Sequence, residues 1–581
     1  MFIILFHAMV AIRQIQACDY IPPKPEEVMV AMTEYPPASR SKRELPWDWI
    51  RIKAEYDDSI NMLNEWMKDK LKGLVRDVLH YFETTLKVHR VKALQFPSTC
   101  TGMAQHFHDE TICLGQCMKR CGPTNVSKSV DYFSCCRCVI RLGECDIGKC
   151  GGWLNDTDFV LFVSLIRNCR NTQLAYAAHC MSDIVTNRPT AGFMNICPEI
   201  FLKTKANKLE RWKSFIKHEL IHALVFSQPL FSNFPRVGRR KPQWDGLSVV
   251  PIPNVIRRVT RLDWETSKGP VKHDVHMIVT PKVTEEARRH FNCSTLEGAE
   301  LENQGGPRAP GNHWEKRVFE NELLSSTATQ VFALSRLTLA LFEDSGWYRV
   351  DYDQAEDMEW GKNLGCAFAT KSCLTWMKMN PTNPYPFCTV YEDARCTTTR
   401  LEKLKCTLGK ANGTFPPGFS SEYDYNNFGY GVHVNASDRC THPTVMRYDS
   451  NTSEVYSESA RCFHLNKTWK AGNEVLNSTR TVGCFESICK NNLLMIKTRG
   501  SKLYPCYEDG QLIHIEKDTY GGEKLELQIV CPSCSELCGP MFCSPEDKFV
   551  KERFSVPTRT AINRRAQFIP VILLIISLNN C

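Results

Sequence analysis

The sequence predicts an α+β fold in which an α/β unit is followed by a region of short strands stapled by disulfides. In the first half of the chain, segments with the apolar spacing of strands and of helices alternate. From about residue 361, cysteine, asparagine and threonine become frequent and the apolar runs become short. The chain has 581 residues, of which 43% are hydrophobic and 23% charged, so it is long enough for two to four domains with their own cores.

The α/β unit begins with "WIRIKAEY", residues 49–56, whose alternation predicts a strand. Residues 59–88 have apolar side chains at helical spacing and predict a long helix. The side chains that give this spacing are Met62, Trp66, Leu71, Val75, Leu79 and Phe82. After a cysteine-rich excursion at 100–150, the run "DFVLFVSLI" predicts a second strand, and another helix is expected to begin near residues 200–210. Residues 229–310, rich in Pro, Gly and Arg, are expected to form loops.

The charge pattern argues against a nucleic-acid partner. The net charge of +8 is small for this length, and short basic clusters such as Arg239-Arg240-Lys241 are most simply solvated loops. Basic runs interleaved with aromatic residues, which a single-strand binder would need, are not found in the sequence.

The cysteines indicate an oxidising compartment. The chain has 29 of them, in tight groups such as Cys113, Cys117 and Cys121. A cytosolic chain with so many thiols would need many metal sites, so disulfides are the simpler account. The pair Cys531-x-x-Cys534 has the spacing of half a zinc knuckle, but it lacks a nearby His and is better explained by disulfides.

The sequence contains eight N-x-S/T sequons, which fit surface glycosylation of an exported protein. They begin at Asn125, Asn155, Asn292, Asn412, Asn435, Asn451, Asn466 and Asn477. Together with the cysteines, these sequons predict a protein that is secreted or attached to the extracellular face of the plasma membrane.

The two ends carry apolar segments consistent with export. Residues 1–17 have the length of a signal peptide, and the run at 1–12 is too short to span a bilayer. The tail, residues 551–581, contains an apolar run at 568–578 that is interrupted by Pro570. A lipid-anchor signal, a membrane tail anchor and a frayed terminus all remain open for this tail.

Residues 18–43 are expected to form a short removable propeptide. The segment ends in Arg40-Ser41-Lys42-Arg43, a stretch that basic-specific convertases cut. Cys18 is its one thiol, and a thiolate is a strong zinc ligand. Two readings of Cys18 stay open: it blocks a metal site before cleavage, or it is a stray or paired cysteine.

A metal-site motif lies in the predicted helix near residue 215. His218 and His222 are four residues apart, so on a helix both imidazoles can face one ion. Glu219 lies beside them, where its carboxylate can reach a water activated by the metal. The H-E-x-x-H pattern is that of zinc peptidases, and it predicts one Zn²⁺ per chain.

Two histidines do not make a catalytic zinc site, and the residues alone leave the third ligand open. Gln228 is a poor candidate because neutral amides seldom bind zinc, and there is no Glu between Glu219 and Glu265. The remaining candidates are the later histidines His273, His276, His290 and His313.

Several blocks of the sequence resemble the leishmanolysin (M8) metallopeptidases, in their animal leishmanolysin-like or invadolysin branch. The most specific blocks are "HELIHALVFS", "TPKVTEEARRHFNCSTLEGAELENQGG", "GNHWEKRVFENELLSS" and "LALFEDSGWYRVDY", with "LAYAAHCMSDIVTNRPTAGFMNICPE" and "CPSCSELCG" in the same order. The resemblance covers roughly residues 49–543. It implies a metzincin-type fold whose third zinc ligand is delayed by an insertion; by position that ligand is His313, whereas His290 belongs to the insertion.

The resemblance also implies a domain order. A catalytic α/β domain with the active-site helix is expected at 44–228, and a central domain with the insertion and the third His at 229–360. A disulfide-rich, mostly β or irregular domain is expected at 361–550.

Two residues depart from the family pattern. Val225 stands where the family has a glycine, and a β-branched residue resists a turn with φ > 0 at a cost of about 1 kcal/mol or more. The alternative is that the chain leaves the helix by another route, towards Pro229. Leu324 stands where the family has the methionine of its Met-turn; the two side chains have similar volumes, so a cost below about 1.5 kcal/mol is expected.

The sequence therefore predicts a zinc endopeptidase that cleaves extracellular proteins or peptides, with Glu219 as general base. The alternative is a catalytically impaired pseudo-protease that serves as a cell-surface adhesion or binding protein. Val225 and Leu324 motivate the alternative, and the retained Glu219 weakens it.

Overall fold

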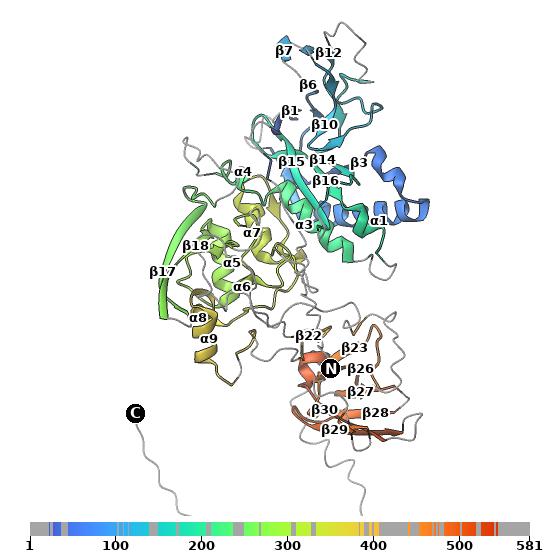
Figure 1. Ribbon diagram of the computed structural model, residues 1–581, viewed down its shortest axis with the longest axis vertical. Coiled ribbons are helices and arrows are strands. Elements are labelled where there is room, and N and C mark those ends of the chain that lie inside the picture. Colours follow the sequence, from blue (N-terminus) through green and yellow to red (C-terminus); the bar gives the residue numbers. More distant parts are fainter. Residues whose placement is uncertain are drawn as a thin grey trace, which may run out of the picture.

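The computed structural model describes much of the chain between residues 22 and 543. The described residues are 22–23, 27–36, 45–100, 104–107, 110–113, 115–138, 149–169, 173–204, 209, 211–235, 237, 249–266, 269–303, 310–326, 333–382, 384–387, 394–397, 400–405, 440–441, 453–466, 470–471, 474–475, 481–499, 502–518, 524–539 and 542–543. They form a mixed α/β structure with many disulfides (Figure 1).

A seven-stranded mixed sheet is the framework of the first half. Its order is β13 (Leu154–Asn155), β5 (Ala93–Gln95), β1 (Met29–Glu34), β15 (Ala175–Asp183), β16 (Pro189–Ile196), β14 (Phe159–Ser164) and β3 (Ile52–Tyr56). β14 runs parallel to both β16 and β3, whereas β15 runs antiparallel to β16. All eight residues of β16 are buried, as expected of a strand covered on both faces.

The two faces of this sheet are covered by different parts of the chain. One face packs against α1 (Glu65–Thr85) and α3 (Trp212–Leu224), in the largest apolar core of the described residues. The other face packs against the cysteine-rich excursion, through Phe96, Tyr132 and Phe133. The disulfide between Cys121 and Cys180 ties the excursion directly to β15. The expected strand–helix–strand–helix unit is therefore present, and Figure 1 shows α1 and α3 together beside β14 and β16.

The first helix is shorter than its apolar spacing predicts. Asn64 caps it by accepting a hydrogen bond from the backbone N–H of Met67, so α1 begins at Glu65 instead of residue 59. Of the residues that gave the helical spacing, Trp66 is 50% exposed and Met62, which lies in the preceding 3₁₀ turn, is 39% exposed. At its other end the helix passes into β4 (Leu86–His89), which pairs with β2 (Trp47–Trp49) and β20 (Arg349–Val350).

Helix α3 lies unusually close to the sheet because β16 contains a glycine. A Cβ atom added to Gly192 would lie 2.9 Å from the Cβ of Ala223 in α3 and 2.9 Å from the carbonyl oxygen of Ala178. Any side chain at position 192 would push the helix away from the sheet. Gly192 therefore sets the depth at which the H-E-x-x-H motif sits.

The expectation of loops over residues 229–310 was wrong for much of that range. Residues 256–278 form a long hairpin of β17 (Ile256–Thr266) and β18 (Gly269–Ile278), and α5 (Pro281–Phe291) follows. The sequence did not predict the hairpin because exposed charged side chains such as Arg257, Arg258 and Asp263 interrupt its apolar residues. The other elements of this half are α2 (Pro198–Phe201), α4 (Gln228–Phe231), β19 (Ala299–Glu300), α6 (Lys316–Phe319) and α7 (Arg336–Asp344).

The cysteine-rich excursion consists of short strands. They are β6 (Thr99–Cys100), β7 (Ala104–Phe107), β8 (Glu110–Cys113), β9 (Cys117–Met118), β10 (Arg120–Cys121), β11 (Thr124–Asn125) and β12 (Cys136–Cys138). Disulfides join Cys100 to Cys113, Cys117 to Cys136 and Cys135 to Cys150.

After α8 (Gly365–Thr370) and α9 (Cys373–Met379), the C-terminal region contains short strands. The strands are β21 (Ala394–Cys396), β22 (Lys403–Lys405), β23 (Ala460–His464), β24 (Lys470–Ala471), β25 (Glu474–Val475), β26 (Val482–Lys490), β27 (Leu493–Lys497), β28 (Leu503–Cys506), β29 (Leu512–Asp518) and β30 (Lys524–Val530), and α10 (Cys534–Cys538) follows. Two four-stranded sheets, β23-β26-β27-β28 and β25-β24-β30-β29, share one small core. Figure 1 shows these strands gathered apart from the seven-stranded sheet.

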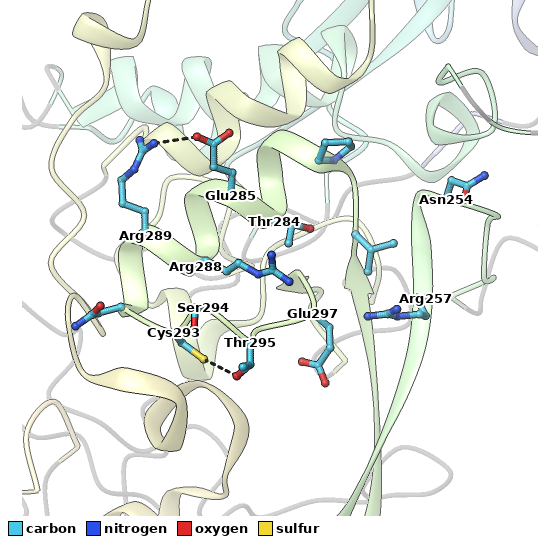
Figure 2. Close-up of a pocket in the computed structure, with 13 residues that line it drawn as sticks. Asn254, Arg257, Thr284, Glu285, Arg288, Arg289, Cys293, Ser294, Thr295 and Glu297 are labelled. Carbon is cyan, nitrogen blue, oxygen red and sulfur yellow. Dashed lines mark hydrogen bonds and ion pairs between the residues drawn. The ribbon is translucent and has the colours of Figure 1, made fainter.

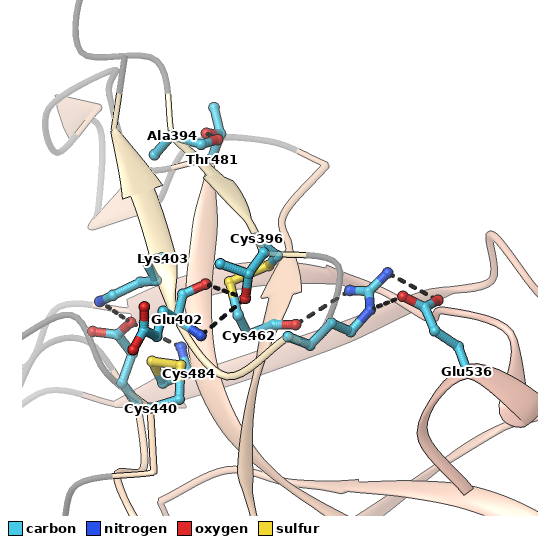
Figure 3. The surroundings of a disulfide bond; sticks show 12 residues. Ala394, Cys396, Glu402, Lys403, Cys440, Cys462, Thr481, Cys484 and Glu536 are labelled. Atoms are coloured by element: carbon cyan, nitrogen blue, oxygen red, sulfur yellow. Dashed lines mark hydrogen bonds and ion pairs between the residues drawn. A yellow bond between two sulfur atoms is a disulfide. The ribbon is translucent and has the colours of Figure 1, made fainter. Parts of the chain in front are cut away.

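Disulfides hold the C-terminal region together, as the cysteine pattern predicts. Figure 3 shows the Cys396–Cys462 bond next to Cys440–Cys484, and Arg400 close by donates to Cys462 and pairs with Glu536 of α10. The half-knuckle reading of Cys531 and Cys534 is excluded, because they form disulfides with Cys506 and Cys543.

The expectations about export fall partly within the described residues. The described sequon residues Asn125, Asn155, Asn292 and Asn466 are all exposed, as glycosylation requires. Asn412, Asn435, Asn451 and Asn477, together with Cys18, the signal segment and the tail at 551–581, lie outside the described residues. Within the part of the chain that the structure describes, none of the helices has the length and apolar character needed to cross a membrane.

Candidate metal centre

Three histidines from two distant parts of the sequence lie close together in the structure. His218 and His222 lie on one side of α3, and His313 lies just before α6. One ring nitrogen from each lies within 4.8 Å of the others, and all three side chains are buried. The ring centre of His313 lies 5.3 Å from that of His218 and 4.9 Å from that of His222.

Hydrogen bonds to carbonyl groups determine which nitrogen of each helical histidine faces the centre. Nδ1 of His218 lies 2.6 Å from the carbonyl oxygen of Leu323, and Nδ1 of His222 lies 2.8 Å from that of Phe226. A carbonyl oxygen only accepts, so each Nδ1 must carry the hydrogen and each Nε2 must present a lone pair. This is the arrangement in which metal-binding histidines are normally held.

Nε2 of His218 lies 3.1 Å from Nε2 of His222. Each of these atoms presents a lone pair, so neither has a hydrogen to donate to the other. A cation between them removes this conflict: two nitrogens on a tetrahedral zinc at about 2.05 Å are about 3.3 Å apart. Burial lowers the pKa of His218 to about 4, and burial together with the neighbouring histidines lowers the pKa of His222 well below its usual value. Both rings are therefore neutral at pH 7 and able to bind a metal.

Glu219 is part of the same helix segment and is only 2% exposed. It directly follows His218 and lies three residues before His222, one turn away along the helix. The carboxylate therefore belongs to the buried surroundings of the three imidazoles.

The chain leaves α3 without the positive φ that would exclude valine. Val225 has φ −154° and ψ −38°, so the positive φ at which glycine is favoured over a β-branched residue does not occur there. The backbone N–H groups of Val225 and Phe226 both donate to the carbonyl of Ile221. This wider last turn directs the carbonyl of Phe226 to His222, and the Phe226 ring packs edge-on against Trp314 at 4.8 Å.

Gln228 braces the segment that carries His313. Its side-chain amide donates to the carbonyl of Pro310 at 3.4 Å, and its side-chain oxygen accepts from Val250. Its backbone N–H donates to Asn312, the residue before His313. Gly311 has φ +75°, and a Cβ there would lie 2.3 Å from the Gln228 side chain, so this close approach requires a glycine.

The turn at 322–326 contacts His218 and is organised by a buried carboxyl group. Glu322 accepts hydrogen bonds from the backbone N–H of Leu324 at 2.5 Å and from the hydroxyls of Ser335 at 2.9 Å and Thr338 at 2.6 Å. These bonds hold the turn so that the carbonyl of Leu323 meets His218. Leu324, at the position of the expected Met-turn, is fully buried.

The other candidate histidines lie elsewhere. His290 contacts the carbonyl of Trp360 through Nε2 at 2.9 Å, and His273 lies against Trp264 with ring centres 4.1 Å apart. His276 is in β18, and its carbonyl accepts from the backbone N–H of Leu301. Of the described histidines, only His313 joins His218 and His222.

An open cavity of about 890 Å³ lies along α5, and none of the three histidines lines it (Figure 2). Its polar lining includes Arg257 of β17 and Arg288 of α5, whose guanidinium groups both point into it (Figure 2). Glu285 and Glu297 are also in its wall, but they pair with Arg289 and Arg261. The cavity is therefore a separate feature from the histidine cluster.

Sequence reasoning missed three supporting residues. Glu322 lies in the same block as His313, but its role in holding the turn was not predicted, because nothing in the sequence indicates which carbonyls it positions. Tyr348, whose hydroxyl donates to the carbonyl of Leu224 at the end of α3, lies in a block with no metal-ligand motif. Gln228 was considered only as a ligand.

Comparison with known proteins agrees with this geometry. The sequence profile of a peptidase family, M8, described as leishmanolysin, matches residues 148–542. The chain is 32% identical to a leishmanolysin-like peptidase of Caenorhabditis elegans over 618 aligned residues, which cover 91% of each protein. It is also 32% identical to a leishmanolysin-like peptidase of Drosophila melanogaster, covering 91% of this chain and 88% of that one. The leishmanolysin of Leishmania major is 29% identical over 66% of this chain and 60% of its own length.

Proposed function

Because the chain belongs to the leishmanolysin family of metallopeptidases, we propose that it is a zinc-dependent endopeptidase that hydrolyses peptide bonds of extracellular proteins. We assign His218, His222 and His313 as the ligands of one Zn²⁺ per chain. The imidazole set is one that zinc accepts, and three protein ligands leave the open position that a catalytic site needs.

The observation that carries this proposal is the 3.1 Å distance between Nε2 of His218 and Nε2 of His222. In each ring a carbonyl oxygen accepts from Nδ1, so Nε2 is left with a lone pair. A structural histidine pair would share one hydrogen between the two nitrogens. Here both rings are held in the tautomer that binds a cation, and the third imidazole completes the set.

Bound zinc would supply Lewis acidity, which polarises a scissile carbonyl and makes a water easier to deprotonate. Glu219 acts as the general base: its carboxylate takes a proton from the attacking water and passes it to the leaving amine. The buried surroundings of Glu219 exclude competing water. Leu323 and Phe226, through their carbonyl groups, keep the two helical imidazoles oriented.

An extracellular substrate is supported by the disulfides and by the exposed sequons. Removal of a propeptide at Arg40 to Arg43, a block of the metal by Cys18 and attachment through the tail remain predictions from the sequence. Leu324 serves as the Met-turn equivalent beneath the metal. The pseudo-protease alternative loses its main motive, because Val225 does not adopt the positive φ that favours glycine.

The test compares the purified protein with Glu219→Gln, an isosteric change that removes the base and keeps the shape. We expect both proteins to contain about one zinc ion per chain, and only the wild type to cleave an unstructured substrate protein. Equal zinc content with no cleavage by the wild type would overturn the peptidase reading and favour a binding protein. Cleavage that survives in Glu219→Gln would show that another residue is the base.

A further inference from the structure

Strand β1 belongs to the segment that the sequence marks for removal, yet it is an interior strand of the seven-stranded sheet. It pairs in parallel with β15, with Met29 opposite Met181 and Ala31 opposite Asp183. It also pairs antiparallel with β5, with Met32 opposite Gln95 and Glu34 opposite Ala93. Ala31, between these two ladders, is fully buried.

A buried carboxyl group fastens the end of this strand. Asp183 is only 1% exposed, and it accepts hydrogen bonds from Thr33 at 2.5 Å and from the hydroxyl of Tyr35 at 2.7 Å. The same carboxyl accepts from Thr186, so it also holds the turn between β15 and β16. Hydrogen bonds to an ionised carboxylate are among the stronger ones, and losing two donors would leave a buried charge undersatisfied.

Loss of β1 would divide the sheet. In the strand order β13-β5-β1-β15-β16-β14-β3, β1 alone joins β5 and β13 to the strands that support α3. Its departure would expose unpaired edges on both neighbours, which folded proteins avoid. The basic motif at Arg40 to Arg43, in a part of the chain outside the described residues, follows β1 and precedes β2.

We propose that residues 27–36 stay bound between β5 and β15 after the chain is cut at Arg40 to Arg43. The mature protein is then a non-covalent complex of two chains and not a single shortened chain. The N-terminal fragment then remains bound as a strand of the mature molecule. This inference does not depend on the proposed peptidase activity, because it rests on strand pairing and on Asp183.

The experiment replaces residues 38–43 in the full chain by the recognition sequence of a site-specific protease that cuts nowhere else. The folded protein is cut, passed over a size-exclusion column at neutral pH, and the main peak is analysed by mass spectrometry. We expect the N-terminal fragment to co-elute with the rest of the chain and to separate only in denaturant. A fragment that elutes alone under native conditions overturns the proposal.

A matched pair of variants tests the role of Asp183. Thr33→Val with Tyr35→Phe removes both donors and retains the strand shape, so the fragment should dissociate roughly tenfold faster or more after cutting. The control is Val30→Thr, at a β1 side chain that is 53% exposed, and it should dissociate at the wild-type rate. Equal rates for the double variant and the wild type would contradict anchoring by Asp183.

Discussion

The region that carries the histidines and the C-terminal region are stabilised in different ways. Residues 211–350 share one extensive apolar core with α1 and the sheet. Their one described disulfide, Cys293–Cys366, connects them to α8. The described part of the C-terminal region has two small cores and five disulfides.

The difference follows from what each region does with its polar groups. The histidine region buries four imidazoles, three of them in the cluster, and several carboxyl groups, which is tolerable only inside a large core that supplies hydrogen-bond partners. The C-terminal region buries too few apolar side chains to fold by burial alone, and cross-links lower the entropy of its unfolded chain. We therefore expect metal binding to depend on the first region only.

The largest effect should come from His313→Ala. It removes one of three converging imidazoles, so zinc content measured by elemental analysis should fall from about one ion per chain to well below that. The control is His290→Ala, because His290 contacts a backbone carbonyl away from the cluster. Zinc loss in the control and not in His313→Ala would show that the third ligand is wrongly assigned.

The next effect is confined to the C-terminal region. Replacing Cys506 and Cys531 by Ala opens a link between residues 25 apart, which should cost about 3–4 kcal/mol of unfolding free energy by the chain-entropy relation. Hydrogen exchange should show faster opening of β27 to β30, while zinc content stays the same. A loss of zinc in this variant would contradict the expectation that metal binding depends on the histidine region alone.

Burial of carboxyl groups makes the stability of the histidine region dependent on pH. Burial raises the pKa of Glu320 from 4.5 to about 7, so the folded state binds its proton more tightly than the unfolded state does. The contribution of Glu320 to the unfolding free energy therefore falls by about 3 kcal/mol as pH rises from about 4.5 to 7. Glu320→Gln cannot titrate, so relative to wild type it should gain stability between pH 5 and pH 8.

Thermal unfolding with saturating zinc at both pH values measures this change for Glu320→Gln. Glu516→Gln, at an exposed side chain in β29, is the control that removes a carboxyl group from the C-terminal region and leaves the buried one in place. A melting temperature of Glu320→Gln that falls relative to wild type as pH rises would contradict this prediction.

The smallest effect is expected from Leu324→Met. Leu324 is fully buried next to Leu323, whose carbonyl contacts His218, and leucine and methionine have similar volumes, so the unfolding free energy should change by less than about 1.5 kcal/mol. Zinc content and kcat/KM for a protein substrate should stay within a few-fold of wild type. A large gain in activity would show that leucine impairs the site.

Much of the first half could be predicted because its signals are local. The apolar run of β14 and the spacing of α1 gave correct elements, although Trp66 proved exposed. The hairpin at 256–278 was missed because its polar face resembles a loop when the pairing partner is unknown. The sequence left two routes out of α3 open at Val225, and the negative φ there agrees with the route that avoids a positive-φ turn.

The sequence by itself determined the helix face with His218, Glu219 and His222, because helical periodicity alone places these residues together. It also predicted disulfides from the number and grouping of the cysteines. Only the tertiary structure decided how His313, 91 residues after His222, reaches them, and which carbonyls hold the imidazoles in one tautomer. It also decided that β1 is an interior strand. These features depend on contacts between segments far apart in the chain, which local spacing does not record.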